Sequence, residues 1–300
     1  MSLRNPARRS RAAGARATRS RSALASLVAG AALAGCAGGN IVARPDSPGS
    51  PQETVYLPRS HSHNNYDQRR PLVDALSRGF ASIEVDVVLQ DGELYVAHGA
   101  EDVTPGATPT LTSLYLDPLR EVVRANGGSV YGPADPPLQL LIDVKTEADE
   151  TYAVLRRVLI RYADILTSWT DGRASLGAVS VVLSGNRAME LVERAPVRYV
   201  GIDGRILDDR EGVTPDVMPL VSEDWERLGP PVEEERLAAA RSVVERMHSE
   251  GRKVRFWATP ESEDLWRSLI AMDVDYIGTD DPERLEGMLR EAERVAAAVD

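Results

Sequence analysis

Short apolar segments alternate with longer amphipathic ones from Val55 to the end of the chain. Short runs with a two-residue apolar period predict strands, and longer runs with a 3.6-residue period predict helices. The predicted strands are 57–63, 81–89, 138–145, 178–183, 197–202, 217–221, 253–258 and 274–277. The predicted helices are 71–78, 149–164, 187–194, 233–250, 262–272 and 282–298.

This alternation predicts an α/β fold. Eight strands with helices between them, over roughly 245 residues, match a single-domain (β/α)8 TIM barrel. A doubly wound open sheet is the alternative, because alternation does not establish closure. Asp91-Gly92 predicts the turn of a small hairpin after the second strand. Segments 99–115 and 127–137 are expected to be loops, the first over the barrel mouth and the second on the opposite face.

The first 35 residues have a different character. They contain seven arginines and no acidic residue, and they end with the apolar run 23–34. A basic segment followed by a short apolar one is typical of a cleaved leader and is too short for a permanent membrane span. Leu33-Ala34-Gly35-Cys36 resembles the lipobox of bacterial lipoproteins. We therefore expect a signal peptide at 1–35, lipidation at Cys36, and anchoring to the membrane of a bacterial cell envelope, on its periplasmic or cell-surface side.

Composition changes this picture only slightly. Residues 36–54 are rich in Gly, Pro and Ser and predict a flexible tether, which leaves 55–300 for the barrel. Cys36 is the only cysteine, so an intrachain disulfide is excluded; a free cysteine in a low-complexity leader is the alternative to lipidation. The net charge is −11, and −18 without the seven leader arginines. This strongly negative charge disfavours nucleic acid as a partner of the barrel. Contact with a membrane would then depend on the lipid anchor.

Candidate chemistry is concentrated between residues 60 and 99, which hold three of the four histidines. Glu84 and Asp86 are two residues apart on one predicted strand, so their side chains point the same way. Two carboxylates this close favour a cation between them. Active sites of TIM barrels lie at the carboxyl ends of the strands. The polar or aromatic residues at or near such ends are His63, His98, Asp143, Lys145, Arg255, Trp257 and Asp280.

The order of these motifs resembles the superfamily of glycerophosphodiester phosphodiesterases and phosphatidylinositol-specific phospholipases C, in the branch typified by altered-inheritance-of-mitochondria-type proteins. The matching segments are His61-Ser-His63-Asn64-Asn65-Tyr66, Arg70-Pro71-Leu72-Val73-Asp74-Ala75-Leu76, Glu84-Val-Asp86, Ala97-His98-Gly99, Leu141-Ile-Asp143-Val-Lys145, Phe256-Trp257-Ala-Thr259 and Gly278-Thr279-Asp280. The resemblance covers nearly all of the chain after the tether and implies the TIM-barrel fold.

The resemblance also implies roles for these residues. Glu84, Asp86 and Asp143 would hold one divalent cation, Mg²⁺ or Ca²⁺, and oxygen ligands without a thiolate suit these ions. His63 and His98 would be the general acid–base pair, while His61 is expected to be structural. The candidates for substrate binding are Asn64, Lys145, Trp257 and Asp280. Asn64 stands where many relatives have an arginine.

These observations predict a metal-dependent phosphoric diester hydrolase that acts on a glycerophosphodiester or phospholipid-type substrate, directly or through a cyclic phosphate. One alternative is a catalytically inactive lipid- or ligand-binding lipoprotein on the same barrel. A glycoside hydrolase fits poorly, because Glu84 and Asp86 cannot flank a sugar from opposite faces. For these two residues a buried salt-bridge network is the structural alternative. The sequence disfavours it, because Lys145 is the only nearby cation that the strands clearly supply.

Overall fold

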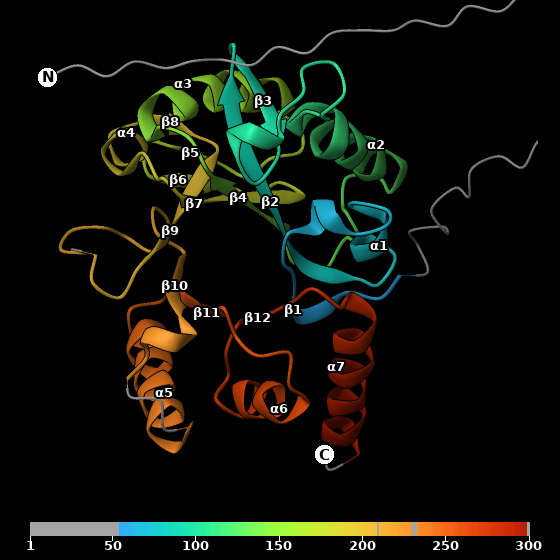
Figure 1. Ribbon diagram of the computed structural model, residues 1–300, viewed down its shortest axis with the longest axis vertical. Coiled ribbons are helices and arrows are strands. Elements are labelled where there is room, and N and C mark those ends of the chain that lie inside the picture. The colour runs from blue at the N-terminus through green and yellow to red at the C-terminus, as the bar shows by residue number, and fades with distance from the viewer. Residues whose placement is uncertain (1–53, 209, 230–232, 299–300) are drawn as a thin grey trace, which may run out of the picture. The chain divides into compact units, whose positions relative to one another are not determined.

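Eight parallel strands close into a barrel in the computed structural model, which describes residues 54–208, 210–229 and 233–298. Around the barrel the order is β1 (Leu57–Ser62), β2 (Phe80–Gln90), β4 (Leu138–Val144), β7 (Val179–Gly185), β9 (Val200–Gly204), β10 (Leu220–Asp224), β11 (Lys253–Trp257) and β12 (Tyr276–Thr279) (Figure 1). Pairing of β1 with both β12 and β2 closes the sheet. The predicted TIM barrel is confirmed, and the open sheet is excluded.

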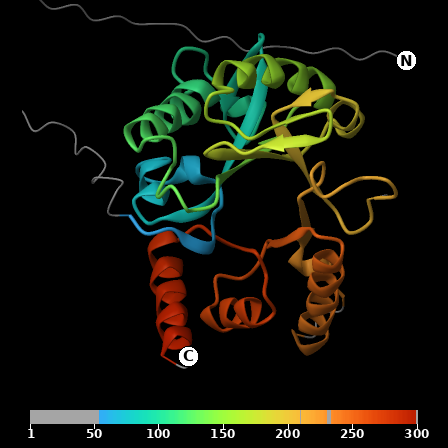
Figure 2. The same ribbon diagram turned by 180° about the vertical axis from the view of Figure 1, so that it is seen from behind.

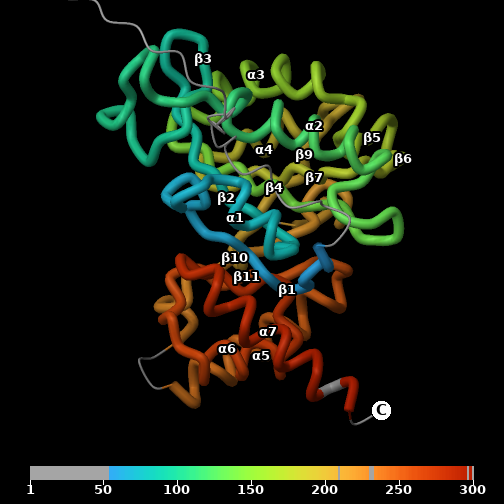
Figure 3. The backbone as a smooth tube through the Cα atoms, turned by 90° about the vertical axis from the view of Figure 1, so that its right-hand side faces the viewer, coloured from blue at the N-terminus to red at the C-terminus, as the bar shows by residue number. Residues whose placement is uncertain are grey.

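The helices surround this barrel in two groups. One group consists of α2 (Asp117–Ala125), α3 (Ala148–Leu159) and α4 (Met189–Glu193), and the other of α5 (Glu233–Ser249), α6 (Glu263–Ala271) and α7 (Pro282–Ala297). Figures 1 and 3 show the groups on different sides of the barrel, and Figure 2 shows them from behind. The short α1 (Val73–Leu76) follows β1. No helix in the described ranges is long and apolar enough to cross a membrane.

Period-two alternation in the strands separates the residues that face the helices from those that face the barrel interior. On β4, Leu140, Ile142 and Val144 are buried in the large core beneath the helices. Leu141 belongs instead to a small second cluster from several barrel strands. Because alternate residues point to opposite faces, Asp143 shares the inward face with Leu141. The apolar cluster thus fills the barrel below the polar site.

Most predicted elements are present, with differences where tertiary contacts intervene. The hairpin is confirmed: β3 (Glu93–Val96) pairs with β2, and Asp91 and Gly92 both have positive φ. Predicted strand 197–202 is instead divided between β8 (Val197–Arg198) and β9. A small separate sheet contains β8, β5 (Ser168–Thr170) and β6 (Arg173–Ser175), and the sequence analysis missed it along with α2. The strands of this small sheet carry too few residues to establish a period. Helix α2 is long enough, with apolar Leu119, Val122 and Val123 on one face, but the sequence analysis did not use this pattern.

Some predictions fall on residues that the structure does not describe. The leader 1–35, Cys36 and residues 37–53 of the tether lie outside the described ranges. Their roles stay predictions.

Candidate active site

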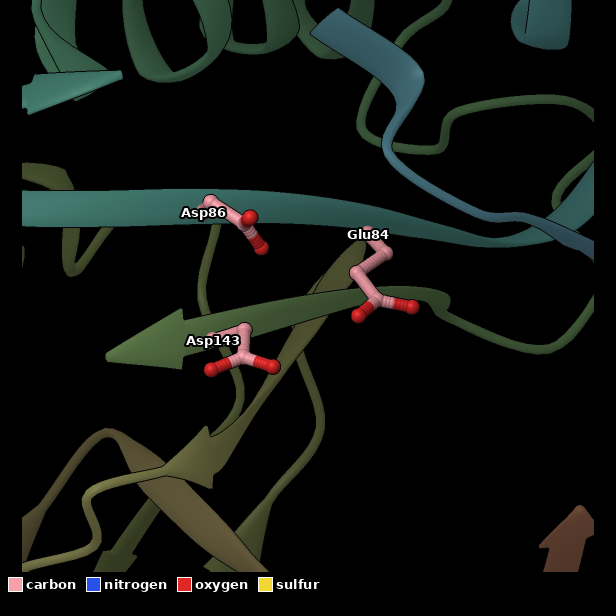
Figure 4. A group of neighbouring side chains, drawn as sticks. All are labelled: Glu84, Asp86 and Asp143. Atoms are coloured by element: carbon pink, nitrogen blue, oxygen red, sulfur yellow. The ribbon is translucent and has the colours of Figure 1, made fainter. Parts of the chain in front are cut away.

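Three carboxylates meet at the carboxyl end of the barrel. Glu84 and Asp86 extend from β2 and Asp143 from the neighbouring β4, to the same side of the two strands (Figure 4). Asp86 pairs in register with Asp143, which places the two at the same level of the barrel. Each residue offers one oxygen, and these atoms all lie within 4.8 Å of one another. The cluster has the size and ligand type of a site for a hard divalent cation.

Glu84 is held from below by two buried groups. The same oxygen, Oε2, lies 2.8 Å from Nε2 of His61 and 2.5 Å from Nη1 of Arg255. Burial alone would raise the pKa of Glu84, but the guanidinium of Arg255 and the hydrogen bond from His61 lower it well below its ordinary value. Glu84 is therefore a carboxylate throughout the neutral range.

His61 is part of a chain of hydrogen bonds under the site. Gln139 donates to Ser82 Oγ (2.9 Å), and Ser82 Oγ lies 2.7 Å from Nδ1 of His61. Burial, followed by the charge of Arg255, lowers the pKa of His61 to about 4, so the ring is neutral. Nε2 of His61 lies within hydrogen-bond distance of both Glu84 and Nη1 of Arg255 (2.7 Å), so the ring contacts both members of the buried ion pair. His61 thus positions a carboxylate from outside the cavity.

The two carboxylate oxygens of Asp86 differ in their hydrogen bonding. Oδ2 accepts three hydrogen bonds, from the hydroxyl of Tyr66 (2.8 Å), Nδ1 of His98 (2.9 Å) and Nζ of Lys145 (3.1 Å). Oδ1 is buried and has no hydrogen-bond partner. A buried carboxylate oxygen without a partner is costly. Asp86 is one of the three carboxylates of the cluster that Glu84 and Asp143 complete.

Lys145 links two of the three acids. Its Nζ lies 3.1 Å from Asp86 Oδ2 and 3.3 Å from Asp143 Oδ2. Burial would lower the pKa of Lys145, but these carboxylates raise it above its ordinary value. Burial raises the pKa of Asp143, and Lys145 opposes that rise. With neutral imidazoles, the three acids together with Lys145 and Arg255 leave one negative charge.

His63 and His98 flank the cluster, each held by an aspartate. Nδ1 of His63 lies 2.7 Å from Asp280 Oδ1, and Nδ1 of His98 donates to Asp86. The side chains are 40% and 71% exposed, respectively. Because Nδ1 is engaged in both rings, Nε2 is the nitrogen left for proton exchange. Both histidines line the same cavity of about 270 Å³.

The cavity brings together most of the predicted site residues. Its walls are His63, Asn64, Glu84, His98, Asp143, Lys145, Ser184, Arg205, Arg255 and Trp257. Asp86 lies just beneath it, fully buried, and Asp280 contacts it through His63. Asn64 has the left-handed φ of 39°, a conformation that asparagine tolerates well.

Sequence analysis missed one ion pair of the site and two residues that line the cavity. The interpretation that Lys145 is the only nearby cation is wrong, because Arg255 reaches Glu84 across the barrel. Ser184 and Arg205 were not selected, although each lies at the carboxyl end of a barrel strand. That position is the one signal that could have identified them.

Gly185, at the end of β7, makes room for the cluster. It has a φ of 64°, and a Cβ there would overlap Asp143 Oδ1. We expect Gly185→Ala to displace Asp143 and to weaken Mg²⁺ affinity at least about 10-fold, since ligand positioning sets metal affinity. Calorimetric Mg²⁺ titration measures this. Gly172→Ala is the matched control, with a φ of 75° and no atom within 4 Å of the new Cβ. Equal affinities in the two variants would contradict the prediction.

Fold and site together define a barrel enzyme with its polar site at the carboxyl ends of the strands. The model of the AIM6-like phosphodiesterase domain matches residues 52–203, and that of the glycerophosphoryl diester phosphodiesterase family matches residues 253–283. The chain belongs to the AIM6-like phosphodiesterase family and is a phosphodiesterase. This confirms the superfamily that the motifs resemble.

Individual relatives agree with this membership. The chain is 30% identical to an altered inheritance of mitochondria protein 6 homolog of Arthroderma benhamiae, over 76% of this chain and 82% of the relative. It is 29% identical to altered inheritance of mitochondria protein 6 of Eremothecium gossypii, over 77% and 69%. A crystal structure of a glycerophosphodiester phosphodiesterase from Parabacteroides distasonis has a TM-score of 0.51 at 15% identity, over 80% of this chain and all of that one. This last likeness supports the fold alone.

The relatives correct one prediction, the bacterial cell envelope. They are fungal proteins whose names refer to the inheritance of mitochondria, not bacterial envelope lipoproteins. The expected localisation is therefore wrong. A leader that is rich in Arg and Ser and free of acids also fits organelle transit peptides, so its composition does not identify a bacterial export signal.

Proposed function

We propose that this phosphodiesterase hydrolyses its diester with one divalent cation held by Glu84, Asp86 and Asp143, and with His63 and His98 as the acid–base pair. The observation that carries the proposal is the unpartnered Asp86 Oδ1, buried beside two further carboxylates. Such an oxygen is stabilised by a bound cation. Mg²⁺ and Ca²⁺ fit because the candidate ligands are all carboxylate oxygens.

The charges of the site support this proposal. The three carboxylates exceed Lys145 and Arg255 by one negative charge when the imidazoles are neutral. A divalent cation together with the single negative charge of a phosphodiester balances this excess. When bound, the cation supplies polarisation of a non-bridging phosphate oxygen and offsets the charge that develops in the transition state.

The histidines handle the protons in this mechanism. Asp280 and Asp86 orient the rings of His63 and His98, so that each Nε2 is available in the cavity. One Nε2 accepts the proton of the attacking hydroxyl, and the other, protonated, donates to the leaving oxygen. Lys145 at the cavity wall orients the phosphate, and Trp257 offers an apolar surface to carbon atoms of the substrate.

A glycerophosphodiester or a phospholipid-type diester is the proposed substrate class. Support comes from the match of residues 253–283 to the glycerophosphoryl diester phosphodiesterase family. A neighbouring hydroxyl in such a substrate can act as the attacking group, which forms a cyclic phosphate and needs no separate nucleophile. The acidic net charge argues against nucleic acid as substrate.

The test is hydrolysis of bis(p-nitrophenyl) phosphate and of glycerophosphodiesters, with Mg²⁺, with Ca²⁺ and with chelator. We expect chelator to abolish activity, and His63→Ala and His98→Ala each to lower kcat by about 10² to 10⁴. His248→Ala is the matched control, because His248 pairs with Asp275 away from the cavity. A folded protein that binds neither metal nor diester would overturn the proposal. Binding without turnover would instead favour the inactive binding protein.

A further inference from the structure

A second polar group lines the cavity on the side away from the histidines. Ser184 stands on β7, and Arg205 directly follows β9. In the closed order of eight strands, β9 is four positions from β1 in either direction. Arg205 therefore stands across the barrel mouth from His63. It also lies between the two segments that the family models match, 52–203 and 253–283.

Arg205 is held firmly in this place. Its Nη1 lies 2.9 Å from Asp203 Oδ2 and also donates to the carbonyl oxygens of Asp203 and Gly204. Its Nη2 donates to Ser184 Oγ (3.1 Å), and Ser184 in turn donates to Asp203 (2.8 Å). Nε takes no part in these contacts. The guanidinium is thus fixed in orientation while part of its donor capacity is left for a ligand.

Asp203, which holds Arg205, is buried, whereas Arg205 itself is accessible from the cavity. Asp203 is fully buried, its Oδ1 has no hydrogen-bond partner, and it is absent from the cavity wall. The side chain of Arg205 is 24% exposed and forms part of that wall. Burying a carboxylate with an unpaired oxygen costs stability. A costly buried acid that fixes an accessible arginine beside an active site is typical of support for a binding group.

We propose that Arg205, held in place by the buried Ser184 and Asp203, forms a subsite for the part of the substrate beyond the phosphate, and that this head group offers oxygen acceptors and carries no positive charge. The proposal rests on the proposed function and names its substrate class more narrowly. With the phosphate beside His63, His98 and the carboxylates, the attached group extends across the cavity toward Arg205. Hydroxyl oxygens of the head group can accept hydrogen bonds from the N–H groups of Arg205. A quaternary ammonium would instead place a second positive charge against the guanidinium, and the two charges would repel.

The experiment compares two diesters that differ in the head group, glycerophosphoglycerol and glycerophosphocholine, using the full chain with Mg²⁺. We expect the wild type to prefer glycerophosphoglycerol in kcat/KM by about 10-fold or more. Arg205→Gln is expected to raise KM for this diester about 10- to 100-fold, with kcat within about threefold and a smaller effect on the choline diester. Ser184→Ala is expected to change KM in the same direction by a smaller factor.

Arg187→Gln is the matched control. Arg187 donates to the carbonyl of Asp203 and pairs with Asp208, but it is absent from the cavity wall. Its replacement loosens the same loop without touching the subsite, so we expect no change in head-group preference. Equal losses for both diesters in Arg205→Gln, or the same loss of preference in Arg187→Gln, would overturn the proposal. If Arg205→Gln fails to fold, the selectivity of Ser184→Ala decides.

Failure of the proposed function gives a different result. A wild type that cleaves neither diester would overturn the proposed hydrolysis while leaving binding measurable. Calorimetry with both diesters then tests the subsite alone. Tighter binding of glycerophosphoglycerol that is lost in Arg205→Gln supports the subsite, and equal or no binding of the two diesters refutes it.

Discussion

Asp86→Asn is expected to lower kcat/KM by about 10³-fold or more while the protein stays folded. One oxygen of Asp86 accepts hydrogen bonds from Tyr66, His98 and Lys145, and its other oxygen is buried without a partner. The amide keeps the shape but loses the charge on which all three contacts depend, so metal binding and proton transfer fail together. Steady-state kinetics and calorimetric Mg²⁺ titration measure the two effects.

A nearby aspartate provides the control for this variant. Asp102 lies on the segment after His98 and is exposed. Its backbone N–H donates to Gly99 and its backbone carbonyl accepts from Thr108. Asp102→Asn removes the same charge close to the mouth but none of the three contacts. We expect its kcat/KM to stay within about threefold of the wild type, since surface charges are weakly coupled to the site. A similar loss of kcat/KM in both variants would contradict the prediction, because it would show that the negative charge near the cavity mouth matters and the contacts of Asp86 do not.

Arg255→Met is expected to destabilise the metal-free protein by about 3–5 kcal/mol. Arg255 and Glu84 are both almost fully buried, and removing one partner leaves an uncompensated charge in the barrel. Urea denaturation in chelator measures the free energy of unfolding. Adding Glu84→Gln to Arg255→Met removes the stranded charge, so the double variant is expected to recover part of the loss.

Arg267→Met is the comparison for an exposed ion pair. Arg267 pairs with Glu263 and Asp264 on α6, and its side chain is 59% exposed. Its replacement is expected to cost less than about 1 kcal/mol. An Arg255→Met variant that is as stable as Arg267→Met would mean that water reaches Glu84 and compensates the lost arginine.

Local sequence patterns accounted for most of the barrel. The alternation around Glu84 and Asp86 predicts β2, and the Asp91-Gly92 turn predicts its hairpin, because both signals are contained within a few residues. The division of strand 197–202 could not be predicted. Arg198 pairs with β5 and stacks on Trp169, a contact that depends on a distant segment.

Motif order also indicated which polar residues meet. His63, Glu84, His98, Asp143 and Lys145 line one cavity because each lies near the carboxyl end of a strand or follows one. Strand ends are readable in the sequence, and barrel geometry brings them to one face. The leader, by contrast, was assigned to the wrong localisation, since its composition fits more than one kind of targeting segment.

The sequence by itself thus determined the alternating elements, the polar strand ends and the family, because these depend on local periodicity and short motifs. Only the tertiary structure decided which charges pair. Arg255 meets Glu84 from 171 residues away, Asp203 fixes Arg205, and Gly185 makes room for Asp143. Such contacts depend on closure of the barrel and on the orientation of each side chain inside it. Neither leaves a repeating pattern along the chain, and a charge pair such as Arg255 and Glu84 is strong only where burial removes it from water.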